Sequence, residues 1–263
     1  MRAMLDVADH HWWFRGRARV IGRELDRLPI PADARILDAG CGSGQTLEQL
    51  VHYGQVQGVE VNPEAASFAR ARGCGEVRVG RLERLDWEPD LFDLITCLDV
   101  IEHTPDDVAT LRELWRVAKP GAWLLVTVPA YPALWSRHDE INHHYRRYTR
   151  KLLRAASETS GWKVERMTSF NSILLPAAAA VRLAARRQKV DRDQRLDLER
   201  GPRFLQRALE WPFELEARWL ARGHMLPAGL SLLAVLRKPP SVEGGRPAPE
   251  LSLAQAGARA HTS

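Results

Sequence analysis

A glycine-rich turn that joins an apolar strand to a helix constrains this chain more than any other feature. Residues 34–44 read ARILDAGCGSG, so Ile36 and Leu37 precede an acidic residue and three glycines at alternate positions. Such glycines let the backbone turn tightly and approach a ligand with no Cβ in the way. The pattern predicts a nucleotide-type cofactor site at the carboxyl end of a buried strand.

Two common glycine-rich motifs fit this turn poorly. The dinucleotide fingerprint needs its third glycine at position 45, which is Gln45. A phosphate-binding loop needs Lys followed by Ser or Thr, and neither follows here. Asp38, close before the glycines, instead offers a carboxylate to a cation. A nicotinamide or flavin site is therefore the weaker interpretation.

Four segments, in order, resemble the class I S-adenosylmethionine (SAM) methyltransferases. ILDAGCGSG looks like their first motif, and GVEVNPEA ends a second strand with Glu60. DLFDLITCLDVIEHT is similar to the fourth strand and exit loop of ubiquinone-type and related small-molecule methyltransferases, and KPGAWLLVTVP resembles the fifth strand. Four segments over residues 30–130 are more specific than one glycine motif.

The resemblance implies SAM as the cofactor. Amides at the start of the GQTLEQL helix would face the methionine carboxylate, Asp38 would balance the cationic side, and Glu60 would take both ribose hydroxyls. Many relatives have an acidic residue near the adenine amine where this chain has Arg81, with Glu83 two residues later. The expected cofactor-binding residues are Asp38, Gly40, Cys41, Gly42, Gly44, Glu60, Val61, Leu82, Glu83, Leu98 and Asp99.

Apolar runs and helical repeats alternate along the chain as in a doubly wound sheet. Strands are expected near 34–39, 55–61, 76–79, 92–99, 122–128, 162–169 and 230–236, with helices that end in glycine between several of them. Thr104, Pro105 and Asp107 suit the N-cap, first and third positions of one helix. The predicted fold is α/β, a Rossmann-like, doubly wound, seven-stranded sheet with an N-terminal helical lid and an α-helical insertion before the last strand.

A chain of 263 residues can bury one sizeable α/β core plus an appendage, so we expect one domain with an insertion. The expected parts are a lid at 1–29, a SAM-binding core at 30–170, a helical insertion or cap at 171–228, the last core strand at 229–238 and a disordered tail at 239–263. The three cysteines form no close pair, which fits reduced thiols and argues against disulfides or a cysteine metal cluster.

Two regions exceed a minimal methyltransferase. Residues 10–28 place Trp13, Arg17 and Ile21 at helical intervals, so their aromatic neighbours either form a lid over the pocket or pack against the sheet edge. In the insertion, FLQRALEWPFELEARWLARG is aromatic-rich with arginines, and Pro212 should bend or restart its helix. The insertion fits a helical cap on the core, which we favour, or a membrane-surface segment.

Polar and aromatic residues cluster after the fourth and fifth strands, where an open α/β sheet binds its ligands. If the acceptor is a hydroxyl, an imidazole or carboxylate must lie within hydrogen-bond reach of it. The candidate bases are His103 and His144, and the candidate acceptor-binding residues are Trp13, Trp135, Asp139, Arg146, Arg147 and Tyr148. The run HHYRRY also resembles a subgroup of bacterial methyltransferases found among genes for surface glycans and natural products, which pair an HWWF-like segment with a His-x-Arg-Arg-Tyr run.

Each candidate has a structural alternative. His103 can cap the following helix, and Arg146 and Arg147 can hold the loop to carboxylates such as Asp139. If the arginines instead face the pocket, they suit a phosphate or carboxylate on the acceptor. A metal site from His138, Asp139, His143 and His144 has no support from a further element, so no metal is expected.

The expected function is a SAM-dependent methyltransferase acting on a small-molecule, sugar or lipid-linked acceptor, with oxygen the favoured atom. The net charge of +5 keeps an RNA or other nucleic-acid methyltransferase open, and a SAM-binding protein without transferase activity is a further alternative. The sequence has no signal pattern and no apolar run of the roughly 20 residues that span a bilayer. We therefore expect a cytoplasmic protein, with peripheral contact at the inner membrane face through the insertion as an open possibility.

Overall fold

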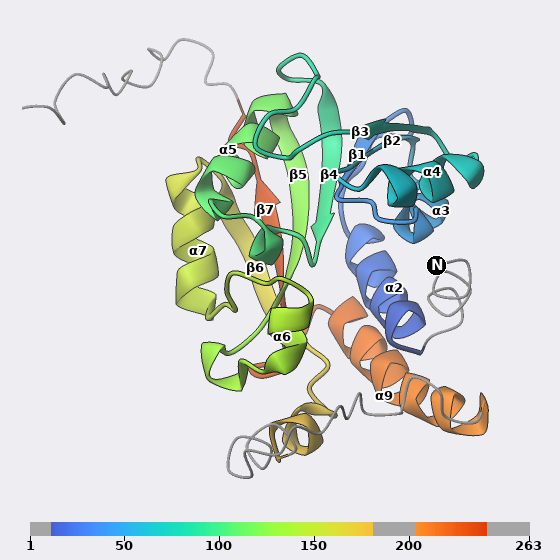
Figure 1. Ribbon diagram of the computed structural model, residues 1–263, viewed down its shortest axis with the longest axis vertical. Helices are drawn as coiled ribbons and strands as arrows, with labels where there is room; N and C mark the ends of the chain where they lie inside the picture. Colours follow the sequence, from blue (N-terminus) through green and yellow to red (C-terminus); the bar gives the residue numbers. More distant parts are fainter. Residues whose placement is uncertain (1–11, 181–202, 241–263) are drawn as a thin grey trace, which may run out of the picture.

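A seven-stranded sheet forms the centre of the molecule in the computed structural model, which describes residues 12–180 and 203–240 (Figure 1). The strand order is β3-β2-β1-β4-β5-β7-β6. The strands are β1 (Arg35–Ala39), β2 (Gln55–Glu60), β3 (Glu76–Val79), β4 (Phe92–Leu98), β5 (Ala118–Pro129), β6 (Lys163–Phe170) and β7 (Ser231–Arg237). Neighbours from β3 to β5 are parallel, whereas β7 runs antiparallel between β5 and β6. The predicted seven-stranded Rossmann-like class is confirmed.

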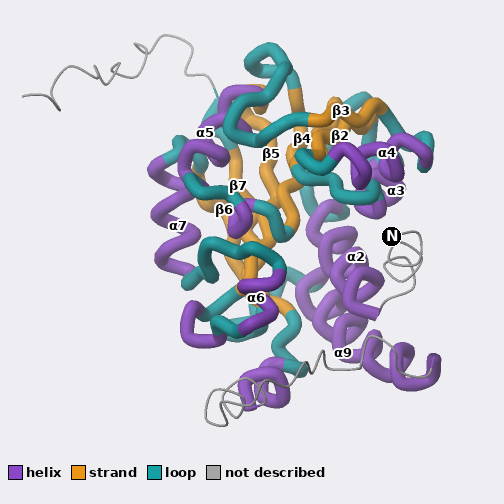
Figure 2. The backbone as a smooth tube through the Cα atoms, viewed as in Figure 1, coloured by secondary structure: helices purple, strands orange, loops and turns teal. Residues whose placement is uncertain are grey.

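Helices cover both faces of the sheet (Figures 1 and 2). One face packs against α2 (Trp12–Leu25), α3 (Gln45–Leu50), α4 (Pro63–Ala71) and α9 (Arg203–Ala221). The other packs against α5 (Asp107–Val117) and α7 (Arg150–Thr159). The loops after β4 and β5 carry the short turns η1 (Ile101–His103) and η2 (Pro132–Leu134) and the helix α6 (Arg137–Ile141). The result is a three-layer α/β/α arrangement.

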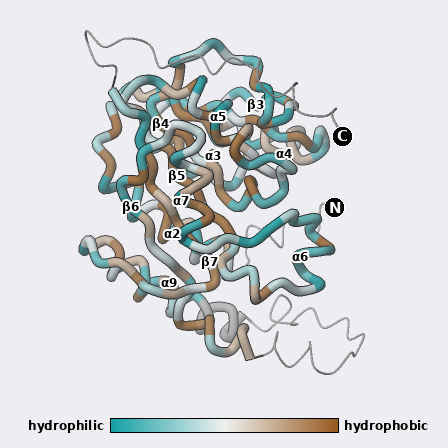
Figure 3. The backbone as a smooth tube through the Cα atoms, turned by 90° about the vertical axis from the view of Figure 1, so that its left-hand side faces the viewer, coloured by the Kyte–Doolittle hydropathy of each residue, from teal (hydrophilic) through white to brown (hydrophobic). Residues whose placement is uncertain are grey.

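Successive residues of the central strands enter different cores. Ile36 and Leu125 belong to the core under α2 and α9, whereas their neighbours Leu37 and Leu124 belong to the core under α5 and α7. A strand covered on both faces must be apolar on both, which is why these segments are continuous apolar runs. Figure 3 shows apolar colour in the interior and hydrophilic colour along much of the outer loops. Burial of each such side chain contributes roughly 1.5–3 kcal/mol.

The start of α5 differs from the prediction. Asp106, not Thr104, is the N-cap, because its Oδ1 accepts a hydrogen bond from the Ala109 amide at 2.9 Å. The Thr104 hydroxyl instead donates to the Ile101 carbonyl at 2.9 Å. Because the turn η1 stands between β4 and α5, the N-cap of α5 lies two residues later than predicted. The prediction of Thr104 as the N-cap is wrong.

Helix α9 of the predicted insertion packs along α2. A Cβ on Gly16 of α2 would lie 2.5 Å from the Phe213 ring, so only glycine allows this approach. Arg19 of α2 donates to Glu210 of α9 at 2.9 Å. The helix continues through Pro212 without a new start.

Some predicted parts fall outside the described residues. These are the first eleven residues of the predicted lid, residues 181–202 of the predicted insertion and residues 241–263 of the predicted tail. The predicted domain boundaries stay a prediction. Among the described residues, no helix has both the length and the apolar character needed to cross a membrane.

Candidate functional site

The carboxyl ends of β1, β2, β4 and β5 meet at one edge of the sheet, beside which α2, α6 and α9 lie (Figure 1). Three residues just beyond strands at this edge have left-handed backbone: Asp99 after β4, Tyr131 after β5 and Asn171 after β6, with φ of 57°, 58° and 59°. This conformation is unfavourable for residues with a Cβ and recurs at functional sites. In an open α/β sheet, ligands bind at this edge.

The glycine turn after β1 opens toward this edge at one position. Gly40, Gly42 and Gly44 all have positive φ, of 79°, 54° and 86°. A Cβ on Gly40 would meet the Val100 side chain at 2.6 Å, and one on Gly44 would meet the Ala69 backbone at 2.9 Å. A Cβ on Gly42 would meet no described atom within 4 Å. Gly42 therefore borders open space in which a ligand can approach the backbone.

Glu60 stands beside Gly42 at the end of β2. Its Oε2 accepts from the Gly42 amide at 3.0 Å and its Oε1 from the Asn62 amide at 2.9 Å. These bonds fix the carboxylate plane, and each oxygen keeps capacity for a further donor. The carboxylate is therefore oriented to accept hydrogen bonds from ligand hydroxyls.

Asp38 is a buried carboxylate with one unused oxygen. Its Oδ1 accepts from the Thr96 hydroxyl at 2.7 Å, while its Oδ2 has no hydrogen-bond partner among the described residues. Burial raises the pKa of Asp38 to about 6, and the hydrogen bond from Thr96 and the charge of Arg17 partly offset that rise. A buried charge is costly unless an opposite charge meets it. The free oxygen fits a cationic ligand.

Arg17 is a functional candidate that the sequence interpretation placed on the lid helix without a role. Its Nη1 lies 2.5 Å from Asp99 Oδ2, and both side chains are largely shielded from solvent. Its charge also offsets part of the rise that burial causes in the pKa values of Asp38 and Glu102. The helical spacing of Arg17 with Trp13 and Ile21 was the available signal, because it places a cation among residues that face inward.

Glu102 was also missed. The residue is 1% exposed, and its Oε2 has no hydrogen-bond partner in the part of the chain that the structure describes. Burial raises its pKa well above the usual range, and the charge of Asp99 adds to the rise. Within the described residues, Glu102, His103 and His144 offer ligand atoms within 4.8 Å of one another, a donor set that transition metals accept.

Asp139, in α6, binds several polar groups of the loop after β5. It is fully buried. Its Oδ1 meets Arg147 Nε at 2.7 Å and His144 Nδ1 at 2.9 Å, and its Oδ2 accepts from the Ser136 amide at 2.8 Å. Burial alone would raise the pKa of Asp139, but the hydrogen bonds from His144 and Arg147 outweigh it and hold the pKa well below its usual range. Asp139 is therefore ionised.

The ionised Asp139 decides the tautomer of His144. A carboxylate only accepts hydrogen bonds, so His144 Nδ1 carries the proton that it donates, and in the neutral ring Nε2 is left as an acceptor. The His103 ring stands edge-on to the His144 ring, with centroids 4.6 Å apart. Burial and the neighbouring His144 lower the pKa of His103. The edge thus carries two adjacent imidazoles, of which His103 is neutral near pH 7.

The other predicted acceptor-binding side chains have protein partners. Arg146 Nη1 lies 2.9 Å from Asp107 Oδ1, and the Tyr148 hydroxyl donates to Asp107 Oδ2 at 2.6 Å. Arg147, besides Asp139, donates to the Ala130 carbonyl at 3.0 Å. These contacts match the structural alternative for the two arginines. Their roles in acceptor binding, like those of Tyr148 and Asp139, stay predictions.

The remaining predicted residues lie in several environments. Trp13 stacks on Phe170 at the end of β6, with ring centroids 6.2 Å apart. Glu83 pairs with Arg81 at 3.2 Å instead of standing free. Leu82, Leu98 and Cys41 are buried, Trp135 is half-buried, and Val61 is exposed. Of the predicted cofactor-binding residues, Gly42 and Glu60 are joined by a hydrogen bond.

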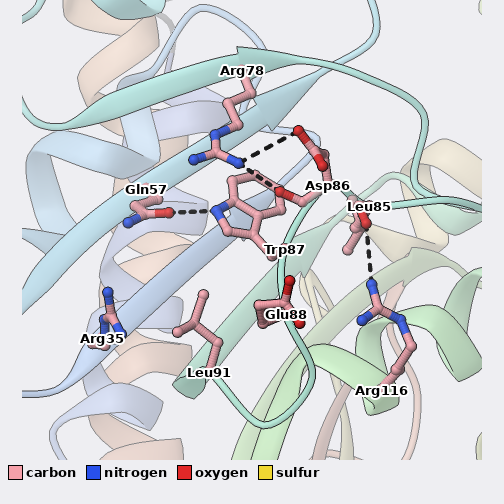
Figure 4. A pocket seen from close by; sticks show the side chains of 9 residues that line it. All are labelled: Arg35, Gln57, Arg78, Leu85, Asp86, Trp87, Glu88, Leu91 and Arg116. Atoms are coloured by element: carbon pink, nitrogen blue, oxygen red, sulfur yellow. Dashed lines mark hydrogen bonds and ion pairs between the residues drawn. The ribbon is translucent and has the colours of Figure 1, made fainter.

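Two cavities lie outside this group. The larger, about 520 Å³, sits at the opposite end of the sheet beside the start of β1, where Arg78 stacks over Trp87 at 4.7 Å and Trp87 donates to Gln57 at 2.7 Å (Figure 4). The smaller, about 270 Å³, lies at the carboxyl ends of β5 and β6 and is lined by Tyr131, Tyr148 and Ser169 among others. Only the smaller one adjoins the loop after β5.

Comparisons with known proteins agree with this geometry. Residues 37–126 match the family model described as a methyltransferase domain. The chain is 37% identical over 113 residues to the ubiquinone biosynthesis O-methyltransferase of Xanthomonas oryzae pv. oryzae, a match that covers 40% of this chain and 47% of that protein. The chain thus spans about half the length of the curated relatives it matches.

Solved structures share the fold at low identity. The phosphoethanolamine N-methyltransferase 2 of Haemonchus contortus in complex with SAM aligns with a TM-score of 0.56 and 17% identity, over 84% of this chain and 52% of that one. The [4+2]-cyclase SpnF aligns with a TM-score of 0.56 and 20% identity, over 86% of this chain and 82% of that one. At these identities the likeness shows the fold alone.

Proposed function

We propose that this chain, which carries a class I S-adenosylmethionine-dependent methyltransferase domain, transfers a methyl group to an oxygen of a small-molecule, sugar or lipid-linked acceptor. The observation that carries the proposal is the combination at one sheet edge of an oriented cofactor group with a pair of imidazoles. The cofactor group is Asp38, Gly42, Glu60 and Asp99, and the imidazoles are His103 and His144. A site that only bound SAM would not need the two imidazoles.

The cofactor group fits SAM by its chemistry. SAM, when bound, supplies an electrophilic methyl group on a sulfonium whose departure leaves a neutral thioether. Glu60, held by two amides, offers oxygens to ribose hydroxyls. Asp38, with a buried oxygen that has no partner among the described residues, offers negative charge to the cationic part. Asp99, whose charge Arg17 meets, would border the methionine end. Gly42 leaves room for the ligand.

Arg17 acts on this site as a positioning residue. Its ion pair with Asp99 ties α2 to the end of β4. Because α2 also packs against α9, the pair holds the lid helix beside the cofactor group. Closing a site in this way excludes water from a transfer that depends on alignment.

The imidazole pair supplies the base that a hydroxyl acceptor needs. SAM would supply the methyl group and leave as a neutral thioether that keeps the electron pair, and His144 or His103 would take the proton that the acceptor hydroxyl loses. His144 Nε2 is ready to accept because Asp139 holds the proton on Nδ1, and Asp139 stabilises the resulting imidazolium. His103, which is neutral, is the alternative acceptor of the proton. Such base catalysis contributes typically 10²–10⁴-fold.

The test supplies SAM with a labelled methyl group to the full chain, together with an extract of the cells that encode it. The products are separated into lipids, water-soluble small molecules and macromolecules. Label in lipids or small molecules that is lost in Gly42→Arg and reduced in His144→Gln supports the proposal. Label found only in nucleic acid contradicts the acceptor class. SAM binding without label in any fraction favours the alternative of a protein that binds SAM without transferring its methyl group.

A further inference from the structure

The outer face of α9 exposes a row of large apolar side chains. Trp211, Leu215 and Trp219 follow one another at intervals of four residues, so they lie on one face of the helix. Their exposed fractions are 64%, 38% and 46%. We call these three residues the α9 outer stripe. Met225, 59% exposed, extends the apolar surface just beyond the end of the helix.

The α9 outer stripe lies outside the two buried cores, and Trp219 stacks on His224 with ring centroids 4.2 Å apart. The inner face of α9 packs into the core through Phe213, Ala217 and Leu220, which are 1% exposed or less. Contacts with Trp12 and Trp13 complete that face, with ring centroids 5.9 and 5.5 Å from Phe213. Two exposed tryptophans and a leucine in one row form the kind of patch that marks an interaction surface.

The two acidic residues of α9 nearest the stripe, Glu210 and Glu214, have arginine partners. Glu210 pairs with Arg15 and Arg19 of α2, at 3.4 and 2.9 Å. Glu214 pairs with Arg218 at 2.8 Å and lies 3.7 Å from Arg19.

The third acidic residue of the described part of α9, Glu216, is buried and accepts from the Asn171, Ser172 and Ile173 amides. Arg218 and Arg222 remain exposed at the surface.

The helix that carries the stripe is tied to the edge of the sheet that holds the candidate site. The bonds from Glu216 tie α9 to the chain that leaves β6 at the carboxyl edge. Phe213, on the inner face, touches Trp13 of the lid helix. Figures 1 and 2 both show α9 alongside α2 at the same end of the molecule as α6. A surface bound by the stripe would therefore lie beside the edge where the ligands are expected.

We propose that the α9 outer stripe docks this protein on an anionic phospholipid surface. Tryptophan favours the boundary between head groups and acyl chains, and leucine favours the apolar side of it. Arg218 and Arg222 meet the phosphate groups of anionic lipids, whose attraction falls as salt screens it. This surface goes beyond the proposed methyl transfer, and its test does not use catalysis.

The test measures sedimentation of the full chain with vesicles. Wild type binds vesicles of phosphatidylcholine mixed with phosphatidylglycerol, and binds vesicles of phosphatidylcholine alone more weakly. The variant Trp211→Gln/Leu215→Gln/Trp219→Gln lowers the partition coefficient by at least about tenfold, because it removes the apolar contacts. Its thermal midpoint stays near that of wild type, since the three side chains are exposed.

Two further variants separate the components of binding. Leu152→Gln changes a leucine of α7 that is 52% exposed, on the other face of the sheet, and keeps wild-type binding. Arg218→Gln/Arg222→Gln weakens binding and flattens its salt dependence. The proposal is overturned if wild type does not bind anionic vesicles, or if the stripe variant binds as well as wild type. It is also overturned if wild type forms dimers that the stripe variant loses and does not bind vesicles, because the stripe would then join two copies of the chain.

Discussion

Asp38 and Asp139 are both buried carboxylates of the same candidate site, yet their environments are opposite. Asp38, at the end of β1, keeps one oxygen without a partner among the described residues, and burial raises its pKa to about 6. Asp139, in the loop after β5, meets Arg147, His144 and Ser136, and its pKa is held far below the usual range. The carboxylate at the end of β1 therefore keeps an oxygen available for a ligand, whereas the carboxylate in the loop after β5 is fully used in holding that loop.

The largest effect is expected from Gly42→Arg, which tests whether the space beside Gly42 belongs to the cofactor. The new side chain enters that space, so binding of SAM measured by calorimetry falls below detection. Gly73→Arg is the matched control, because Gly73 also has positive φ, 70°, and a Cβ there would meet no described atom within 4 Å. Both variants carry the backbone strain of roughly 1–2 kcal/mol. Equal loss of SAM affinity in both variants would show that strain, not occlusion, is responsible.

The next effect concerns the imidazole pair. His144→Gln lowers kcat by about 10²–10⁴-fold and leaves the SAM dissociation constant unchanged, because the base acts only in the transfer step. His103→Asn has the same effect if His103 takes the proton, and a smaller one if it only borders the acceptor. His143→Asn, at an exposed position with φ of 55° that asparagine tolerates, serves as the control. Unchanged kcat in both His144→Gln and His103→Asn would show that neither imidazole acts as the base.

Asp139→Asn tests whether the charge of Asp139 stabilises the loop after β5. The substitution leaves the buried Arg147 guanidinium without its charge partner, so the free energy of unfolding falls by about 3–5 kcal/mol. In wild type the pKa of Asp139 is lower in the folded than in the unfolded state. Its contribution to stability is therefore complete above the unfolded pKa and is lost as pH falls through the folded pKa. Urea unfolding at neutral pH measures the effect, and a change within about 0.5 kcal/mol would contradict it.

Asp38→Asn is expected to have the smallest and opposite effect on stability. The pKa of Asp38 is raised in the folded state, so its stabilising contribution is present below the unfolded pKa and is lost as pH rises through about 6. The variant removes this loss and shows a smaller decline in stability between about pH 4 and 7 than wild type. Urea unfolding across that range measures the difference in slope. Identical slopes would mean that burial does not perturb Asp38.

The fold was predictable because its signals are local. The central strands β4, β5 and β7 contain long apolar runs, and each of the seven predicted ranges overlaps an observed strand. The glycine turn and Glu60 lie directly at strand ends, so parallel topology brings them together. The N-cap of α5 was wrong because a short turn before a helix leaves little trace in sequence.

The partners of charged side chains were not predictable in the same way. Arg17 meets Asp99 across 82 positions of the chain, and the bond from Arg147 to Asp139 spans eight positions through an irregular loop. No periodicity relates such residues, so the sequence interpretation left the two loop arginines open between ligand and loop. The burial of Glu102 beside Asp99 depends on how η1 turns after β4, which the DVIEH run alone does not specify.

The proposed function depends most on Asp38, whose buried oxygen without a partner among the described residues would meet the cationic part of SAM. The most direct measurement is the SAM dissociation constant of wild type and Asp38→Asn, determined by calorimetry from pH 5 to pH 7. Wild type is expected to bind SAM more tightly as pH rises through about 6, where Asp38 ionises in the free protein. Asp38→Asn is expected to bind weakly, with most of that pH dependence lost. Equal affinity and equal pH dependence in the two proteins would contradict this role of Asp38.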